Sequence, residues 1–193
     1  MTVGPGAFPA APLITFTGLA DGTEVNGLSV GGFQFSYSLG NGQLVIDGGP
    51  GTTNNIAPPN IVSTGNSTGI LTILLPSTAT AFGYGYAILN TIAVTNATTI
   101  SVFNGATALG SLSYNGVPDP TFTGGFAGIQ STIPFDRVAL TFNSTAAPAF
   151  ALDNIRLASV PEPSTMLLVL VGVIGFGLVP KIGSRSRSAT PSA

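Results

Sequence analysis

Four oxygen-bearing residues have the types and spacing to hold a hard cation. Asp21 and Glu24 lie in a polar segment near the start of the chain, and Asp153 and Asn154 lie in the last apolar stretch before residue 160. Ca²⁺ binds about 6–8 oxygen ligands of this kind. We therefore predict a structural calcium site formed by Asp21, Glu24 and Asp153. Turn chemistry, in which Asp and Asn side chains bind nearby backbone groups, is the alternative.

The chain lacks the residue types that most enzymes use for catalysis. It contains no His and no Cys, so the commonest general base and the thiol nucleophile are absent. A hydrolase built from this chain would need two Asp carboxylates about 5–10 Å apart. We therefore expect a non-enzymatic protein, and a carboxylate-dependent hydrolase remains an alternative.

Two tyrosines and one glycine-rich segment could bind ligands. Tyr84 and Tyr86 are two residues apart, so they share one face of a strand. Exposed together, they would form a platform for sugar stacking, and a surface glycan-binding module is the second functional hypothesis. Packing into the core is the alternative, and the absence of Trp favours it. The segment 47–51 has no following Lys or helix, so it is predicted to be a turn and not a phosphate loop.

The composition favours one domain that does not bind nucleic acid. Hydrophobic residues make up 44% of the chain, which is enough for a core, and charged residues only 6%. Arg137 and Arg156 are the cations that precede residue 160. Binding to nucleic acid requires clustered Lys and Arg, so we expect no such partner. We predict a disordered segment over residues 1–12 and one domain over 13–158.

The apolar pattern predicts an all-β domain. Alternating apolar residues predict strands, and Gly-rich or Asn-Gly dipeptides predict the turns between them. The expected strands are 13–17, 33–39, 43–46, 70–75, 82–88, 100–103, 107–114, 138–142 and 150–157, with hairpin turns at 40–42 and 104–105. Residues 47–68 are predicted to be a long surface loop, and 124–129 a short Gly-rich segment. Short strands with regular turns favour an antiparallel two-sheet β-sandwich of the jelly-roll type.

The C-terminal residues have the order of a membrane anchor. Met166–Val179 is an uncharged apolar run, and Lys181, Arg185 and Arg187 follow it. A helix needs about 20 residues to cross a bilayer, so the run and its uncharged neighbours, about 164–182, predict one transmembrane helix. The cations place the basic tail, 181–193, in the cytoplasm and the domain outside. A buried helix of a soluble domain is the alternative.

The hexapeptide Val160-Pro161-Glu162-Pro163-Ser164-Thr165, with the apolar run and basic end behind it, resembles the PEP-CTERM sorting tail of bacterial exported proteins. The resemblance extends over residues 159–193. It implies that an exosortase, an integral-membrane transpeptidase, recognises Pro161, Glu162 and Pro163 and cleaves near them. It also implies an exported protein of the cell envelope or extracellular polysaccharide matrix. Such a protein is a single-pass membrane protein or is released to the cell surface or matrix after processing.

A second, looser resemblance covers most of the domain. The start and the end of the domain are similar to exported domains found upstream of PEP-CTERM tails. The matching residues are Ile14-Thr15-Phe16 with Gly18-Leu19-Ala20-Asp21-Gly22-Thr23 at the start, and Phe150-Ala151-Leu152-Asp153-Asn154-Ile155 at the end. This resemblance implies a jelly roll similar to carbohydrate-binding modules, without implying that sugar binding is retained. It also implies that the first and last strands are neighbours.

The first residues do not have the pattern of an export leader. Residues 1–12 contain neither a basic n-region nor a long apolar h-region. Because the predicted topology requires export, we expect a leader upstream of Met1. Insertion of the terminal helix as a tail anchor, with the domain in the cytoplasm, is the alternative.

Overall fold

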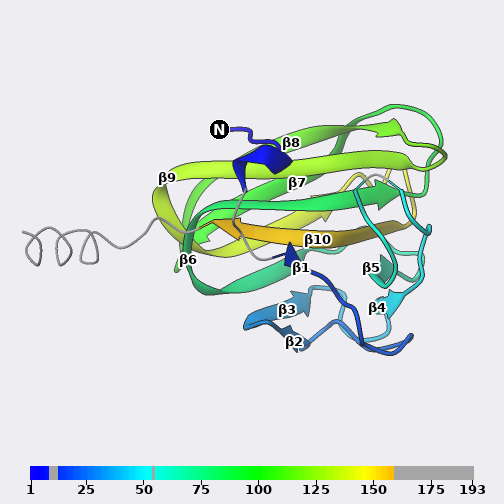
Figure 1. Ribbon diagram of the computed structural model, residues 1–193, viewed down its shortest axis with the longest axis horizontal. Coiled ribbons are helices and arrows are strands. Elements are labelled where there is room, and N and C mark those ends of the chain that lie inside the picture. Colours follow the sequence, from blue (N-terminus) through cyan, green and yellow to red (C-terminus); the bar gives the residue numbers. More distant parts are fainter. Residues whose placement is uncertain (9–12, 54, 159–193) are drawn as a thin grey trace, which may run out of the picture. The chain divides into compact units, whose positions relative to one another are not determined.

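The described residues form an all-β structure, as the sequence predicts. The computed structural model describes residues 1–8, 13–53 and 55–158. Its elements are η1 (Pro5–Ala7), β1 (Leu13–Ile14), β2 (Ser29–Val30), β3 (Phe33–Tyr37), β4 (Leu44–Asp47), β5 (Asn60–Ser63), β6 (Leu71–Ile88), β7 (Val94–Asn104), β8 (Thr107–Pro118), β9 (Thr123–Phe142) and β10 (Phe150–Ala158) (Figure 1). The chain divides into two units, Met1–Ser159 and Val160–Ala193. The predicted transmembrane helix at 164–182 lies outside the described residues. Within the described part, no helix has the length and hydropathy needed to cross a bilayer.

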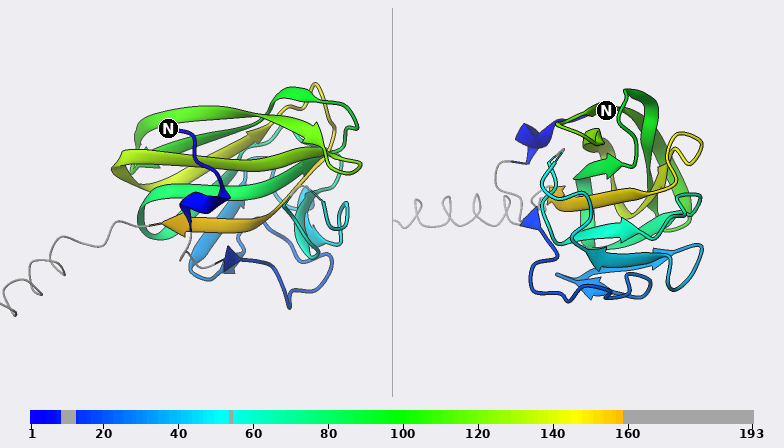
Figure 2. Two further views of the ribbon diagram at one scale, coloured as in Figure 1. Left: turned by 45° about the horizontal axis from the view of Figure 1, so that its top comes forward. Right: turned by 90° about the vertical axis from the view of Figure 1, so that its right-hand side faces the viewer.

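Two long strands, β6 and β9, each contribute to both layers of a β-sandwich (Figures 1 and 2). Leu71–Leu74 of β6 pair with β3 on one side and with β9 on the other. Ala81–Ile88 of the same strand pair with β10 and with an earlier part of β9. One layer therefore has the order β2-β3-β6-β9-β7-β8, and the other has β4-β5-β10-β6-β9. Every one of these pairings is antiparallel.

Prolines lie where these strands pass from one layer to the other. The register of β6 shifts between Leu74 and Ala81, around Pro76. In β9 the pairing with β6 moves from Gln130 to Phe135, around Pro134. A proline has no N–H to donate to a ladder, so it marks a place where regular pairing stops. Both strands can therefore bend without leaving a backbone donor unpaired at the proline.

Aromatic side chains fill the space between the layers. Phe33, Phe35 and Tyr37 alternate on β3 and are all buried. Tyr37 meets Phe150 of β10 edge-on, with ring centroids 6.4 Å apart. Phe150 in turn stacks on Phe142 of β9 at 3.8 Å and 8°. One continuous core therefore connects strands of both layers.

The hairpin predicted over residues 33–46 is wrong. β3 pairs with β2 and β6, whereas β4 pairs with β5, so the turn between β3 and β4 joins the two layers. Gly40 and Gly42 have φ values of +79° and +77°, which glycine adopts without strain. The backbone N–H of Gly42 donates to Glu24 Oε2 at 2.5 Å. Turn residues were recognised correctly, but they do not determine which strands pair.

Other strand predictions need smaller corrections. The loop predicted over 47–68 contains β5, because Asn60–Ser63 pair with both β4 and β10. The separate segments 70–75 and 82–88 are one strand, β6, and the segments 124–129 and 138–142 both belong to β9. The hairpin over 100–114 is confirmed, with Asn104 opposite Thr107. The strand predicted at 13–17 is shorter and ends at Ile14.

Residues 1–8, which were predicted to belong to a disordered segment, make backbone hydrogen bonds to β9, while residues 9–12 lie outside the described part. The Val3 N–H donates to the Gly128 carbonyl at 2.8 Å, and the Gln130 N–H donates to the Met1 carbonyl at 2.8 Å. β8 pairs with β9 only at residues 123 and 124, so the β9 backbone beyond them needs another partner. The N-terminal segment provides it.

Candidate functional site

The structure does not bring the predicted calcium ligands together. β1 does pair with β10, with Leu13 opposite Arg156, so the first and last strands are neighbours. After Ile14, however, the chain leaves β10, and the Gly22 N–H donates to the Ile46 carbonyl of β4 at 2.8 Å. Across the described ranges, no three His, Cys, Asp or Glu side chains form a group that could hold a metal ion. Asp21, Glu24 and Asp153 therefore do not share one site.

Each predicted ligand has its own place instead. Asp21 is exposed in a turn. Glu24 accepts the Asn26 N–H at 3.1 Å and the Gly42 N–H at 2.5 Å, which is the turn chemistry given above as the alternative. Asp153 is buried on β10, and the Asn154 side chain donates to the Asn55 carbonyl at 2.6 Å.

Tyr84 and Tyr86 lie in the core, so the predicted alternative is confirmed and a tyrosine platform is excluded. Both side chains are 0% exposed. The hydroxyls of Tyr84 and Thr98 are 2.5 Å apart, and Tyr86 donates to the Asn115 carbonyl at 3.0 Å. Burial raises the pKa of both phenols well above the ordinary value. These hydroxyls therefore remain protonated and serve as hydrogen-bonding groups of the core.

The outward face of the second layer is lined by small residues. Gly83, Gly85 and Ala87 alternate with the buried tyrosines along β6, so they point away from the core. The described part of the β4–β5 loop, residues 48–53 and 55–59, packs directly on this face. A Cβ at Gly85 would collide with the backbone of Asn55, and Ile56 packs with Ala87 and Ala151.

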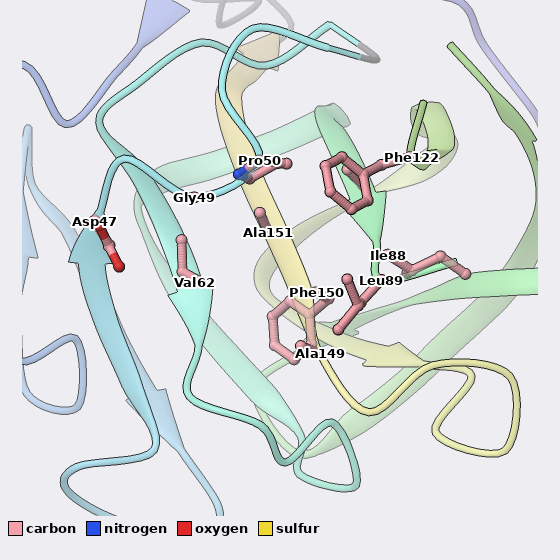
Figure 3. A pocket seen from close by; sticks show the side chains of 11 residues that line it. Asp47, Gly49, Pro50, Val62, Ile88, Leu89, Phe122, Ala149, Phe150 and Ala151 are labelled. Atoms are coloured by element: carbon pink, nitrogen blue, oxygen red, sulfur yellow. The ribbon is translucent and has the colours of Figure 1, made fainter. Parts of the chain in front are cut away.

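A pocket of about 280 Å³ lies beside the β4–β5 loop (Figure 3). Val62, Ala151 and Ala87 are aligned across β5, β10 and β6 and form part of its lining. Phe122 lies on one side of Ala151 and Asp47 on the other. The lining residues are Asp47, Gly49, Pro50, Val62, Ala87, Ile88, Leu89, Phe122, Ala149, Phe150 and Ala151. An apolar lining with one carboxylate suits a small ligand that has both an apolar face and hydrogen-bond donors.

Two buried polar side chains lie next to this pocket. Asp153 is 2% exposed and Asn60 is 0% exposed. Asp153 Oδ2 accepts the Ala57 N–H at 3.3 Å, and Asn60 Nδ2 donates to the Gly48 carbonyl at 3.1 Å. The Oδ1 atoms of Asp153 and Asn60 have no hydrogen-bond partner. Burial raises the pKa of Asp153 to about 6, against the opposing effect of the Asn154 and Ala57 N–H groups.

Sequence reasoning found Asp153 but missed Asn60 and the pocket. Asn60 follows two prolines in a segment that was predicted to be a loop, so nothing in its local sequence indicates burial. The segment 47–51 is a turn as predicted, with the Gly48 N–H bound to Asp47 Oδ1 at 2.5 Å. Its role in lining a pocket depends on strand pairings that the local sequence does not contain.

Comparison with known proteins identifies the C-terminal segment. Residues 159–181 match the family model of the PEP-CTERM protein-sorting motif. The chain carries a PEP-CTERM sorting signal. The PEP-CTERM match covers Pro161, Glu162 and Pro163 and the apolar run, and so agrees with the resemblance seen in the sequence. It does not extend into residues 1–158.

The domain that precedes the PEP-CTERM signal is distantly similar to solved carbohydrate-binding modules. A variant of the family 29 carbohydrate-binding module CBM29-2 aligns with a TM-score of 0.42 and 9% identity, covering 78% of this chain and 92% of that chain. A CBM29-2 variant complexed with mannohexaose aligns with a TM-score of 0.39 and 10% identity, covering 73% of this chain and 94% of that chain. No curated protein matches the chain. TM-scores this low support no inference about ligands.

Proposed function

We propose that this chain is an exported, non-enzymatic protein of the cell envelope or extracellular matrix, delivered to an exosortase by its PEP-CTERM signal. The observation that carries the proposal is the sorting motif at residues 159–181. In this proposal the exosortase recognises Pro161, Glu162 and Pro163, and the helix at about 164–182 spans the bilayer. Lys181, Arg185 and Arg187 then stay on the cytoplasmic side, because cations are retained there.

The environments of the carboxylates support a non-enzymatic role. Glu24, Asp47 and Asp136 each accept backbone N–H groups at turns, with Asp136 bound to the Gly105 N–H at 3.0 and 3.1 Å. Asp153 is buried beneath the β4–β5 loop. The carboxylates named here therefore have structural uses that account for their positions. We also retain the jelly-roll topology as part of this proposal.

The proposed topology can be tested with protease on intact spheroplasts from cells that express the full gene. We expect the protease to digest residues 1–158, because the three tail cations hold the C-terminus in the cytoplasm. A cytoplasmic marker in the same cells should stay intact and serves as the control. Protection of both the domain and the marker would place the domain in the cytoplasm and overturn the proposal.

The pocket favours a second candidate function, a surface glycan-binding module. A pyranose has an apolar face that can pack on Phe122 and hydroxyls that can donate to Asp47, and both residues line the pocket. Asp47 is exposed, so its carboxylate is accessible to a ligand. This candidate is compatible with an exported protein, because its ligand would be an extracellular polysaccharide.

We predict that the Phe122→Ala substitution weakens polysaccharide binding about tenfold, which corresponds to about 1.4 kcal/mol of lost packing. Affinity electrophoresis of the chain in gels with and without soluble polysaccharides measures the effect. The matched control is Phe103→Ala, because Phe103 is half-buried on β7 under Arg137 and does not line the pocket. If the parent chain is not retarded by any polysaccharide, or if both variants bind equally well, the pocket does not bind glycans.

A further inference from the structure

Asp153 and Asn60 each lie one residue beyond the paired residues of β10 and β5. Ala151 of β10 is opposite Val62 of β5, and Leu152 is opposite Ile61. Continuing this antiparallel register by one residue places Asp153 opposite Asn60. Side chains at such positions have Cβ atoms about 4.5–5.5 Å apart. Leu152 and Ile61 point into the core, so Asp153 and Asn60 both point to the outward face of the layer.

The β4–β5 loop encloses this pair and fixes the orientation of both side chains. The Ala57 N–H binds Asp153 Oδ2, and the Gly48 carbonyl accepts Asn60 Nδ2. Only the nitrogen of the Asn60 amide can donate to a carbonyl, so Oδ1 is the atom that has no partner. Asp153 Oδ1 has no partner either. Two enclosed acceptor oxygens on adjacent positions therefore require a donor or a cation.

Arg156, three residues after Asp153 on β10, contacts another part of the domain. Arg156 donates to the Pro5 carbonyl at 3.3 Å and lies over the Phe126 ring at 5.8 Å. One water molecule could donate to both Oδ1 atoms, but like the Ala57 N–H it would bring no positive charge to the buried carboxylate. A divalent cation would bind both oxygens and neutralise that charge. Asp47 lies directly opposite Asn60 on β4 and adds a second negative charge beside Asn60.

We propose that Asp153 Oδ1 and Asn60 Oδ1 bind one Ca²⁺ ion beneath the β4–β5 loop. A ligand set made only of oxygens selects a hard cation, and Ca²⁺ accepts carboxylate, amide, carbonyl and water oxygens in flexible geometry. The ion ties the loop to β5 and β10. Because Gly49 and Pro50 of this loop line the pocket, the ion also holds one side of the pocket in place.

The test uses the full-length chain in non-ionic detergent, stripped with a chelator and titrated with CaCl₂. We expect a saturable rise in the melting temperature, since an ion that binds only the folded state stabilises it by mass action. Calorimetry should find one Ca²⁺ per chain. For the Asp153→Asn variant and the parent, the order of melting temperatures in Ca²⁺ should be the reverse of the order in chelator. In chelator the neutral isostere should melt at or above the parent, because it removes a buried charge, and in Ca²⁺ the parent should melt higher.

Two further variants complete the test. Asn60→Asp adds a carboxylate to the site and should tighten Ca²⁺ binding about tenfold, since affinity rises with ligand charge. If Asp153→Asn does not fold, the Ca²⁺ affinity of the Asn60→Asp variant tests the site. Asp21→Asn is the matched control, because Asp21 is exposed in a turn, and its Ca²⁺ response should equal that of the parent. If Ca²⁺ does not change the melting temperature of the parent, a water molecule occupies the site and the proposal is overturned. The proposal is also overturned if Ca²⁺ raises the melting temperature of the Asp153→Asn variant as much as that of the parent.

Discussion

Replacing Pro161, Glu162 and Pro163 with alanine will leave the protein uncleaved and membrane-bound in a host that carries an exosortase. These residues lie in the match to the sorting motif, and we propose that the exosortase recognises them. A proline restricts its own φ and biases the residue before it towards extended backbone. Alanine removes that restriction and the Glu162 charge. Immunoblots of membrane and released fractions measure the effect.

The triplet substitution should abolish cleavage almost completely. This loss of cleavage should result from the changed triplet and not from failed membrane insertion. The apolar run Met166–Val179 is unchanged in the variant, so anchoring is expected to persist. A matched control replaces Ser184, Ser186 and Ser188 with alanine, which also changes three tail residues but leaves the triplet intact. The control should be processed like the parent. Equal release of the triplet variant and the control would show that the triplet is not the recognition element.

The second large effect is expected from the Phe142→Ala substitution in the core. Phe142 is 7% exposed, stacks on Phe150 at 3.8 Å and contacts Tyr84 edge-on at 6.5 Å. Removing a buried ring costs about 3–5 kcal/mol, and a domain of this kind has about 5–15 kcal/mol of stability in total. We therefore expect the free energy of unfolding to fall by a large fraction. Urea unfolding followed by tyrosine fluorescence measures it.

Ile133→Ala is the control for this core substitution. Ile133 is an apolar residue of the same strand, β9, but its side chain is 53% exposed. Surface substitutions usually change the free energy of unfolding by less than about 0.5 kcal/mol. If both variants unfold at the same urea concentration, the ring stack of Phe142 and Phe150 does not stabilise the sandwich.

Local signals in the sequence predicted the class of the fold and its local turns but not the strand pairing. Asn104-Gly105 predicted a hairpin correctly because both of its strands are adjacent in sequence. The turn at 40–42 was also predicted to close a hairpin, yet β3 pairs with β6 and β4 with β5. Turn residues report backbone conformation, whereas pairing depends on contacts with distant segments. Pro76 and Pro134 both lie inside long strands, although proline is disfavoured within strands.

The same distinction applies to the candidate sites. Asp153 could be singled out from its residue type, but its partner Asn60 could not, because the two meet only through the register of β5 and β10. The calcium ligands expected at Asp21 and Glu24 failed for the same reason, since residues near them pair with β4. The sorting motif needed no partner within the chain, and so the sequence was sufficient to find it.

The position of β10 has a consequence for the order of events while the chain is being made. β10 is the last of the described strands in sequence, yet it lies between β5 and β6 in the second layer and also pairs with β1. Until Phe150–Ala158 is available, β5 has no strand to connect it to β6, and Phe142 has no ring to stack on. The most recently made residues are the last to leave the ribosome, so this layer closes late in synthesis. In an exported chain, the domain therefore completes its fold only as the sorting signal itself emerges.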